Sequence, residues 1–312
     1  MTSALPSLRQ LRYLVVLAEY LNFRQAAEQL FVTQSTLSAG IKELENILGA
    51  QLLERDKRSV RVTPVGEQVI ERARGLLAQA QDLVAIAKGA QEPFCSLLRL
   101  GVIPTIAPFL LPAILPALRK HYPKLQLYLR EDVTDRVLEQ IDSGQLDFGL
   151  IALPYDTGEL TVRDLFRDEF WFVAREDDPH ANDNAIAVRE IDPDRVLLLE
   201  EGHCLRDHAI AACGSRLRNQ QAGLEATSLY TLLQMVEGGM GVTLLPEMML
   251  KAGALKGTRL VARPFSTRVP ARTIALVARR STPLRRDFEL LADLILEQNR
   301  SATRPRTASR RK

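Results

Sequence analysis

The first fifty residues carry the pattern that most constrains the fold of this chain. Leu8–Glu19 repeats apolar residues at helical spacing, and a second short helix is expected after Asn22, which suits a helix N-cap. A third helix is expected over Ser35–Leu48, where the inward-facing residues are Leu37, Ile41, Leu44 and Leu48. Ala26 and Ala27 are small enough to let the helices approach closely. Two short helices, a tight turn and a third helix predict a helix-turn-helix.

The third helix begins with uncharged hydrogen-bonding side chains. They are Thr33, Gln34, Ser35, Thr36 and Ser38. A hydrophobic core needs none of these, whereas a helix that reads DNA base edges needs donors and acceptors at its N-terminal end. With Arg24 and Lys42 they form the expected DNA-binding set of this segment. The alternative is an ordinary capped helix with a polar face.

A charged turn follows the third helix. Beyond it, the alternation of Val60 and Val62 with Arg61 predicts a small β-hairpin, which would form a wing beside the helix-turn-helix. Its expected DNA-binding cations are Arg55, Lys57 and Arg58. Phosphate contacts of this kind supply affinity and salt dependence rather than sequence choice. The alternative is a turn whose charges are only solvated.

Pro64 starts a long helical run that is expected to continue to about Ala90. Its apolar residues recur on one broad stripe, formed by Leu76, Leu77, Leu83, Val84 and Ile86. Such a helix is unstable in isolation, so we expect it to pair with its twin in a dimer. Packing against its own domain is the alternative. Glu92-Pro93 breaks the run, which places the end of the linker there.

Length and composition limit the class of protein. A chain of 312 residues suggests two or three domains, and 46% hydrophobic with 25% charged residues is ordinary for a soluble globular protein. Three cysteines exclude a disulfide-stapled secreted scaffold. No stretch approaches the roughly 18–20 apolar residues of a membrane span, and the N-terminus does not resemble a signal peptide. We therefore expect a cytoplasmic protein with no membrane contact.

The net charge of +3 hides an uneven distribution. Residues 1–64 carry a net +2, residues 65–299 a net −5 and residues 300–312 a net +6. Basic ends on an acidic body favour nucleic-acid contact by an end of the chain. For the tail, 301–312, a solubilising and disordered segment is the stronger expectation.

Strands alternate with helices along residues 93–300, and this alternation predicts parallel α/β sheets. We expect two lobes, the first of about 96–164 and 269–300 and the second of about 165–268. Such domains bind ligands in the cleft between the lobes, near the C-terminal ends of strands.

Cys204 follows an apolar strand and stands at the start of a predicted helix. Helix N-terminal amides and a nearby cation lower the pKa of a thiol, and His203 and Arg206 are close in sequence. Peroxide converts a thiolate to a sulfenic acid, which a second thiol can turn into a disulfide. Cys213 would lie about 13 Å away on a continuous helix, whereas bonded cysteines have Cα atoms about 4.4–6.8 Å apart. A bond between them would require rebuilding this segment, which could make oxidation a conformational switch.

Other interpretations of the cysteines stay open. The pair can be buried and structural, or a zinc site can form from His203, Cys204, His208 and Cys213. Adjacent ligands are not a usual zinc spacing, so we expect no metal and no cofactor. Cys95 has no partner nearby in the sequence, and we expect it to be a small buried apolar residue.

The segment from Leu8 to about Ala90 resembles the DNA-binding head of LysR-type transcriptional regulators. The resemblance is carried by FRQAAEQLFVTQSTLSAGIKELENILGAQLLERDKRSVRVTPVGE. It implies a winged helix-turn-helix at 1–64, a dimerising linker helix at 65–92 and, at 93–300, a two-lobed α/β regulatory domain similar to periplasmic solute-binding proteins. Its implied partners are double-stranded DNA, further copies of the chain in a dimer and a tetramer, and RNA polymerase. The operator sequence stays open, because Ser35, Ala39 and Gly40 depart from the residues usual in the family.

The thiol segment resembles that of peroxide-sensing members of the same family, through GHCLRDHA and the spacing of Cys204 and Cys213. The resemblance implies that peroxide attacks Cys204, that Cys213 resolves the product, and that oxidative-stress genes are activated. It also implies a peroxide pocket of Thr105, Thr134, His203, Arg206, Asp207 and Arg272. Arg130 stands where histidine is common, which leaves that edge of the pocket open.

Three other functions are weighed against a peroxide-sensing regulator. A related regulator would bind a small metabolite in the cleft. A thiol peroxidase would consume peroxide as an enzyme, but the polar start of the third helix argues against it. A solute-binding protein would need an export signal. We therefore expect a DNA-binding regulator and not an enzyme.

Overall fold

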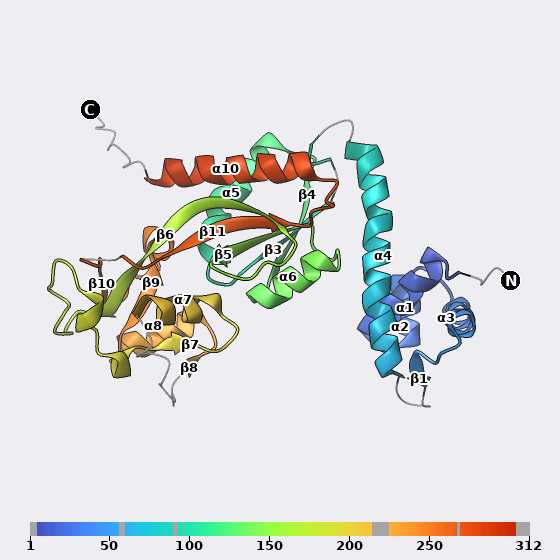
Figure 1. The fold of residues 1–312 in the computed structure, drawn as a ribbon, viewed down its shortest axis with the longest axis horizontal. Helices are drawn as coiled ribbons and strands as arrows, with labels where there is room; N and C mark the ends of the chain where they lie inside the picture. Colours follow the sequence, from blue (N-terminus) through green and yellow to red (C-terminus); the bar gives the residue numbers. More distant parts are fainter. Residues whose placement is uncertain are drawn as a thin grey trace. The chain divides into compact units, whose positions relative to one another are not determined.

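The computed structural model describes residues 5–55, 60–89, 93–95, 97–213, 225–266 and 269–303. The chain divides into two compact units, one of Met1–Gln91 with Gln140–Leu146 and one of Glu92–Glu139 with Asp147–Lys312. We call them the N-terminal unit and the C-terminal unit (Figure 1). None of the described helices is both long and apolar enough to cross a membrane.

Three helices open the N-terminal unit: α1 (Leu8–Tyr20), α2 (Phe23–Gln29) and α3 (Gln34–Leu48). Each begins at a side chain that accepts a hydrogen bond from an amide of the helix's own first turn, which satisfies a donor that the helix leaves free. These N-caps are Ser7, Asn22 and Thr33. The predicted cap at Asn22 is confirmed, and α3 is capped by Thr33.

The core of these helices follows the predicted apolar spacing. Its fully buried members include Leu14, Leu17, Ala26, Leu37, Ile41 and Leu44. Ala26 and Ala27 of α2 are buried, as expected for residues that allow close helix packing. The prediction for Leu48 was wrong, because this last residue of α3 extends beyond the core and is exposed.

Two short antiparallel strands follow: β1 (Leu53–Arg55) and β2 (Val60–Val62). They confirm the predicted hairpin, with Leu53 opposite Val62. Lys57 and Arg58 lie outside the described residues, and so does the side chain of Arg55.

The long helix α4 (Pro64–Gly89) has two different halves. Its N-terminal half packs against α1, and Ile70 and Ala73 belong to the buried core of the N-terminal unit. Further along, Leu76, Leu83 and Val84 are exposed. The first half therefore packs within its own unit, while the second half carries the unpaired apolar residues that a partner helix would need.

The C-terminal unit begins with an alternation of strands and helices. In chain order these are β3 (Leu97–Val102), α5 (Ala107–His121), β4 (Gln126–Glu131), α6 (Thr134–Asp142) and β5 (Phe148–Leu153). Strand β3 pairs in parallel with both β4 and β5, as a strand–helix–strand connection requires.

The rest of the main sheet is antiparallel, which corrects the prediction of parallel sheets. It contains β6 (Thr161–Arg175), β9 (Thr243–Pro246), β10 (Leu260–Arg263) and β11 (Ala271–Ala278). The first part of β6 pairs with β11, which also pairs with β5, while its last part pairs with β9 and β10. One 15-residue strand therefore runs through both lobes, visible as the long curved arrow in Figure 1.

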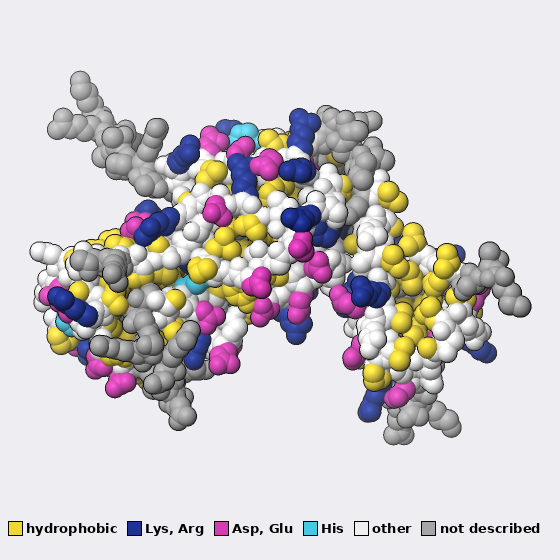
Figure 2. Space-filling model, viewed as in Figure 1, with side chains coloured by type: hydrophobic (Ala, Val, Ile, Leu, Met, Phe, Trp, Pro, Cys, Tyr) yellow, Lys and Arg dark blue, Asp and Glu magenta, His cyan; other side chains and the backbone are white. Residues whose placement is uncertain are grey.

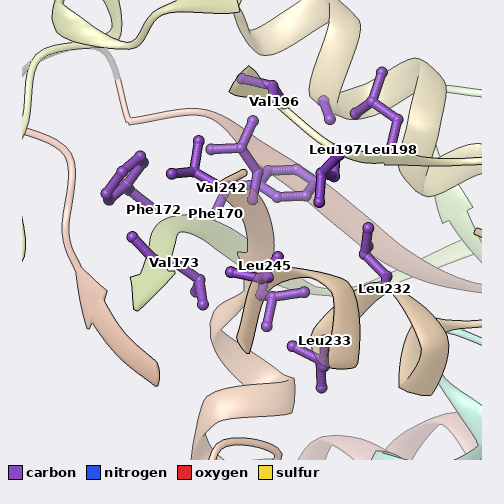
Figure 3. Close-up of a cluster of buried hydrophobic side chains, with 14 of the residues drawn as sticks. Phe170, Phe172, Val173, Val196, Leu197, Leu198, Leu232, Leu233, Val242 and Leu245 are labelled. Carbon is purple, nitrogen blue, oxygen red and sulfur yellow. The ribbon is translucent and has the colours of Figure 1, made fainter. Parts of the chain in front are cut away.

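The second lobe has its own apolar core, drawn in Figure 3. Buried residues of β6 such as Phe170 and Phe172 pack there with Leu232 and Leu233 of α8 (Leu229–Glu237). The remaining elements are η1 (Val188–Glu190), η2 (Pro193–Arg195), β7 (Leu198–Leu199), α7 (Cys204–Cys213), β8 (Glu225–Ala226), α9 (Glu247–Lys251) and α10 (Arg285–Thr303). Strands β7 and β8 pair in parallel next to α7.

Candidate functional site

The two cysteines predicted to be redox-active, Cys204 and Cys213, lie at the two ends of α7. Cys204 is the first residue of α7 and its side chain is buried, and Cys213 is the last of the ten residues. The side chain of Cys213 lies outside the described residues. Because α7 is continuous, its ends are about 13 Å apart, too far for a disulfide. In the described conformation Cys204 is therefore a free thiol, and no bond joins it to Cys213.

A buried arginine 68 residues further along the chain, Arg272, acts on this thiol. Arg272 lies opposite Asp168 in the β11–β6 ladder, and its Nε donates to the Asp168 carboxylate at 3.0 Å. Its Nη1 donates to Thr105 Oγ1 at 2.9 Å, and its Nη2 to the Thr105 carbonyl at 3.1 Å. The backbone N–H of Met248 donates to the other Asp168 oxygen at 2.9 Å. These bonds fix the guanidinium in a buried position.

Burial raises the pKa of the Cys204 thiol, and this effect outweighs the groups that favour the thiolate. The positive charge of Arg272 lowers the pKa, and the hydroxyls of Thr134 and Thr105 lower it further, while Asp207 raises it. The expectation of a lowered thiol pKa was therefore wrong, because the sequence shows neighbouring cations but not burial. At neutral pH the resting Cys204 is mainly a thiol.

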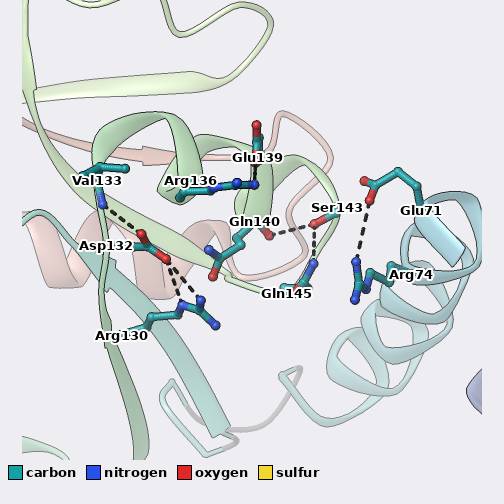
Figure 4. A network of polar contacts seen from close by, with 10 residues as sticks. All are labelled: Glu71, Arg74, Arg130, Asp132, Val133, Arg136, Glu139, Gln140, Ser143 and Gln145. Atoms are coloured by element: carbon teal, nitrogen blue, oxygen red, sulfur yellow. Dashed lines mark hydrogen bonds and ion pairs between the residues drawn. The ribbon is translucent and has the colours of Figure 1, made fainter. Parts of the chain in front are cut away.

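The hydroxyl of Thr134 acts on the Cys204 thiol and makes no hydrogen bond to another described residue. Thr134 is the first residue of α6, and its Oγ1 is buried without a hydrogen-bond partner among the described residues, although it lies close enough to Cys204 to favour a thiolate. The chain just before it is held by Asp132, which accepts from the Val133 amide at 3.0 Å and from the Arg130 guanidinium at 3.1 Å (Figure 4). Arg130 therefore pairs on the surface with Asp132.

The remaining predicted pocket residues come from the segment around Cys204. His203 is buried, with its Nε2 3.9 Å from a carboxylate oxygen of Glu200. Arg206 donates to the carbonyl of Leu199 at 3.0 Å, so it ties α7 to β7. Asp207 is among the groups that shift the Cys204 pKa most, and it raises that pKa. The structure thus brings Thr105, Thr134, Asp207 and Arg272 to the thiol.

Sequence reasoning missed three residues of this region. Asp168 is 36 residues before Cys204 and carries no local signal, so only the sheet register could reveal it. Tyr155 donates to Asp135 at 2.6 Å and has a pKa raised by burial and then by that bond. His208, considered only as a zinc ligand, donates from Nε2 to the Pro154 carbonyl at 3.1 Å. Its position four residues after Cys204 on a helix could have predicted a shared face.

The predicted DNA-binding residues lie on the surface of the N-terminal unit. Thr33, Gln34, Ser35 and Thr36 are exposed at the start of α3, Ser38 is half-buried, and Arg24 and Lys42 are exposed. The Thr33 hydroxyl is 2.9 Å from that of Ser35 and 2.7 Å from that of Thr36, so these three form a capping cluster. Arg24 pairs with Glu28 at 3.1 Å.

The expectation that Cys95 is buried was wrong. Its side chain is exposed rather than buried. It lies in the short link before β3, next to the buried ring of Phe94, which occupies the apolar space at this point. A reagent in solution can therefore reach Cys95.

Comparison with known proteins identifies the family. Residues 8–67 match the bacterial regulatory helix-turn-helix protein family, lysR type, and residues 91–300 match the LysR substrate binding domain. The chain belongs to the LysR family of bacterial regulators.

Its relatives include two named regulators. It is 47% identical to the HTH-type transcriptional regulator EstR of Acinetobacter baylyi, over 94% of this chain and 97% of that protein. It is 39% identical to the DNA-binding transcriptional dual regulator OxyR of Escherichia coli, over 93% of this chain and 94% of that protein.

Solved structures agree with this family. A full-length OxyR variant from Pseudomonas aeruginosa, with a cysteine replaced by aspartate, matches with a TM-score of 0.79 at 36% identity, over 94% of this chain and 95% of that one. A hydrogen-peroxide-bound OxyR variant from Corynebacterium glutamicum, with a cysteine replaced by serine, matches with a TM-score of 0.66 at 32% identity, over 96% and 95%.

Proposed function

We propose that this LysR-family regulator senses hydrogen peroxide through Cys204 and Cys213 and controls oxidative-stress genes as an activator. The observation that carries the proposal is a buried thiol at the start of α7, facing Arg272 and two threonine hydroxyls. A positive charge and hydroxyl donors stabilise the negative charge that develops on sulfur and on the departing oxygen. The names of the OxyR relatives support the same assignment.

The proposed chemistry consumes one peroxide and two thiols. The Cys204 thiolate attacks one peroxide oxygen, the O–O bond breaks, and the departing hydroxide takes a proton to leave as water. Cys204 is then a sulfenic acid. The Cys213 thiolate attacks its sulfur, the S–O bond breaks, and a second water leaves as the disulfide forms. Because α7 separates the two cysteines, the second step requires α7 to unwind, which links oxidation to a change of conformation.

Peptide mapping without reductant tests this proposal. After one equivalent of hydrogen peroxide, a peptide pair joined through Cys204 and Cys213 is expected, and thioredoxin or dithiothreitol should reverse it. Finding both cysteines still as thiols while Cys95 is oxidised would overturn the proposal. A cell metabolite that raises the melting temperature of the dithiol protein would instead favour a metabolite-responsive regulator.

We propose that α3 reads base edges and that the wing cations Arg55, Lys57 and Arg58 hold phosphates. Gln34 supports the first role, because it is exposed at the start of α3 and, unlike its three hydroxyl neighbours, is not part of the capping cluster. Exposed cations such as Lys42 fit the second kind of contact.

Substitutions at these two positions are expected to act differently. Gln34→Ala should weaken binding to an operator selected from random duplexes by about 1–3 kcal/mol and leave binding to unrelated DNA unchanged. Lys42→Ala should weaken binding to both and reduce the slope of log affinity against log salt by about one. Fluorescence anisotropy from 50 to 300 mM salt measures both. An operator affinity that does not change with salt would contradict the phosphate contacts.

We propose self-association through exposed apolar residues along α4 and beside it. Exposed apolar residues of α1, α3, α4 and the segment before α1 line a shared groove: Leu5, Leu8, Leu48, Val65 and Leu76. Figure 2 shows hydrophobic side chains gathered over α1 and α4 of the N-terminal unit. A dimer would cover these apolar side chains, and we propose that two such dimers form a tetramer. The regulator would act in the cytoplasm, where its DNA and RNA polymerase are found.

A further inference from the structure

His208 connects the redox helix to a distant part of the chain. It lies one helical turn after Cys204, so both side chains share a face of α7. Its imidazole is 6% exposed, and Nε2 lies 3.1 Å from the carbonyl oxygen of Pro154, just after β5. The contact spans 54 positions of sequence. It therefore fixes α7 to the strand that forms the middle of the first-lobe sheet.

The second ring nitrogen of His208 has no hydrogen-bond partner in the part of the chain that the structure describes. Nδ1 is buried, and no described residue offers it a hydrogen bond. Because a carbonyl oxygen only accepts, Nε2 must carry the hydrogen, and Nδ1 in the neutral ring is a bare lone pair. A proton added to Nδ1 would bring a buried positive charge that no described residue accepts by a hydrogen bond, which is costly. The site therefore suits neutral histidine and excludes imidazolium.

The charged groups around His208 reinforce this preference. Burial lowers its pKa most, and Arg272 of β11 lowers it further. The bond to the Pro154 carbonyl and the negative charge of Asp207 act in the opposite direction. Of the other elements packed against α7, β7 carries only leucine, and the charged side chains of η1, Arg189 and Glu190, are exposed.

We propose that His208 is a positioning residue that holds α7 in its helical, dithiol conformation and releases it when protonated. Unwinding of α7 breaks the bond to Pro154 and exposes the ring to water. Acid and peroxide then act on the same helix. This role of His208 rests on the proposed function, because it takes the unwinding of α7 to be the conformational switch that oxidation requires.

The direction of the pH effect follows from linkage. In the opened helix the imidazole is exposed and has an ordinary pKa of about 6.5, whereas in the closed helix its pKa is lower. The opened state therefore binds protons more readily, and the stabilisation of the closed state is complete above pH 6.5 and declines as pH falls below it. At pH 5.5 opening increases by at most about tenfold relative to pH 7.5.

Two variants distinguish the effect of the His208–Pro154 hydrogen bond from the effect of protonating His208. His208→Gln keeps an N–H donor of similar reach and cannot titrate near neutral pH, whereas His208→Phe removes the donor and retains the ring volume. Hydrogen exchange of α7 amides is measured on the full-length dithiol protein at pH 7.5 and 5.5, corrected for the intrinsic pH dependence of exchange. Amides of α8, Leu229–Glu237, serve as the reference for global opening.

The wild-type protein should exchange faster in α7 at pH 5.5, His208→Gln should not, and His208→Phe should exchange about tenfold faster than wild type at pH 7.5. Equal pH responses of the wild type and His208→Gln, or unchanged α7 protection in His208→Phe, would overturn the proposal. No peroxide is present, so these outcomes do not depend on peroxide sensing. Peroxide added afterwards tests the proposed function separately, because failure of all three proteins to form a Cys204–Cys213 link overturns that function alone.

Discussion

Replacing Cys204 by serine is expected to abolish the response to peroxide while preserving the fold and the DNA affinity of the dithiol form. A serine hydroxyl does not form a nucleophilic anion near neutral pH and cannot be oxidised to a sulfenic acid, so neither proposed step can occur. Serine is close to cysteine in size, which limits the disturbance at a side chain that is 3% exposed. Mass spectrometry of the thiols and DNase footprinting before and after peroxide measure the loss.

The exposed Cys95 provides a matched control. Cys95→Ser removes a thiol that reagents in solution reach more easily than Cys204, and it should leave the peroxide response at the wild-type level. A normal footprint change in Cys204→Ser would exclude thiol sensing and favour a ligand in the cleft. Loss of the peroxide response in Cys95→Ser would contradict the assignment of peroxide sensing to Cys204. The two variants therefore show whether reactivity with peroxide depends on burial beside Arg272 or on exposure to solvent.

The N-terminal unit could be predicted well from sequence because its structure is local. Apolar residues three and four positions apart define a helix face wherever they occur, so Leu37, Ile41 and Leu44 were assigned to the core correctly. Caps are equally local, as Asn22 shows. The exception, Leu48, is at a helix end, where the spacing continues but the core does not.

The C-terminal sheet was predicted less well because strand direction is set by distant partners. An apolar strand has the same pattern in parallel and antiparallel neighbours, so nothing local shows that β11 returns between β5 and β6. This return places Arg272 opposite Asp168 and brings it to Thr105, 167 residues away. The same limit explains the error about the Cys204 pKa, since burial depends on the whole lobe.

Replacing Arg272 by methionine is expected to lower the free energy of unfolding of the C-terminal unit by about 3–5 kcal/mol at pH 7. The reason is that Asp168 stays buried and loses the cation that receives its charge, while Thr105 loses two hydrogen bonds. The chain has one tryptophan, Trp171, three residues after Asp168 on β6, so its fluorescence during urea unfolding reports on this region.

The pH dependence of this loss has a defined sign. Burial raises the pKa of Asp168, and Arg272 is the strongest group that opposes the rise. Without Arg272 the carboxyl has a still higher folded-state pKa, so its penalty is largest at neutral pH and declines as acid protonates it. The difference in stability between Arg272→Met and the wild type should therefore narrow from pH 7 to pH 5.

The double variant Arg272→Met with Asp168→Leu decides whether the charge pair or the packing is responsible. If the unpaired carboxylate causes the loss, removing both charges should restore most of the stability, because a buried ion pair often contributes little net free energy over an apolar pair. A double variant as unstable as Arg272→Met would show that packing dominates. The restored protein should nevertheless oxidise Cys204 more slowly than the wild type, since the charge that favours the thiolate is gone. Stability and reactivity at this site would then be separable, and Arg272 would be present for the thiol rather than for the fold.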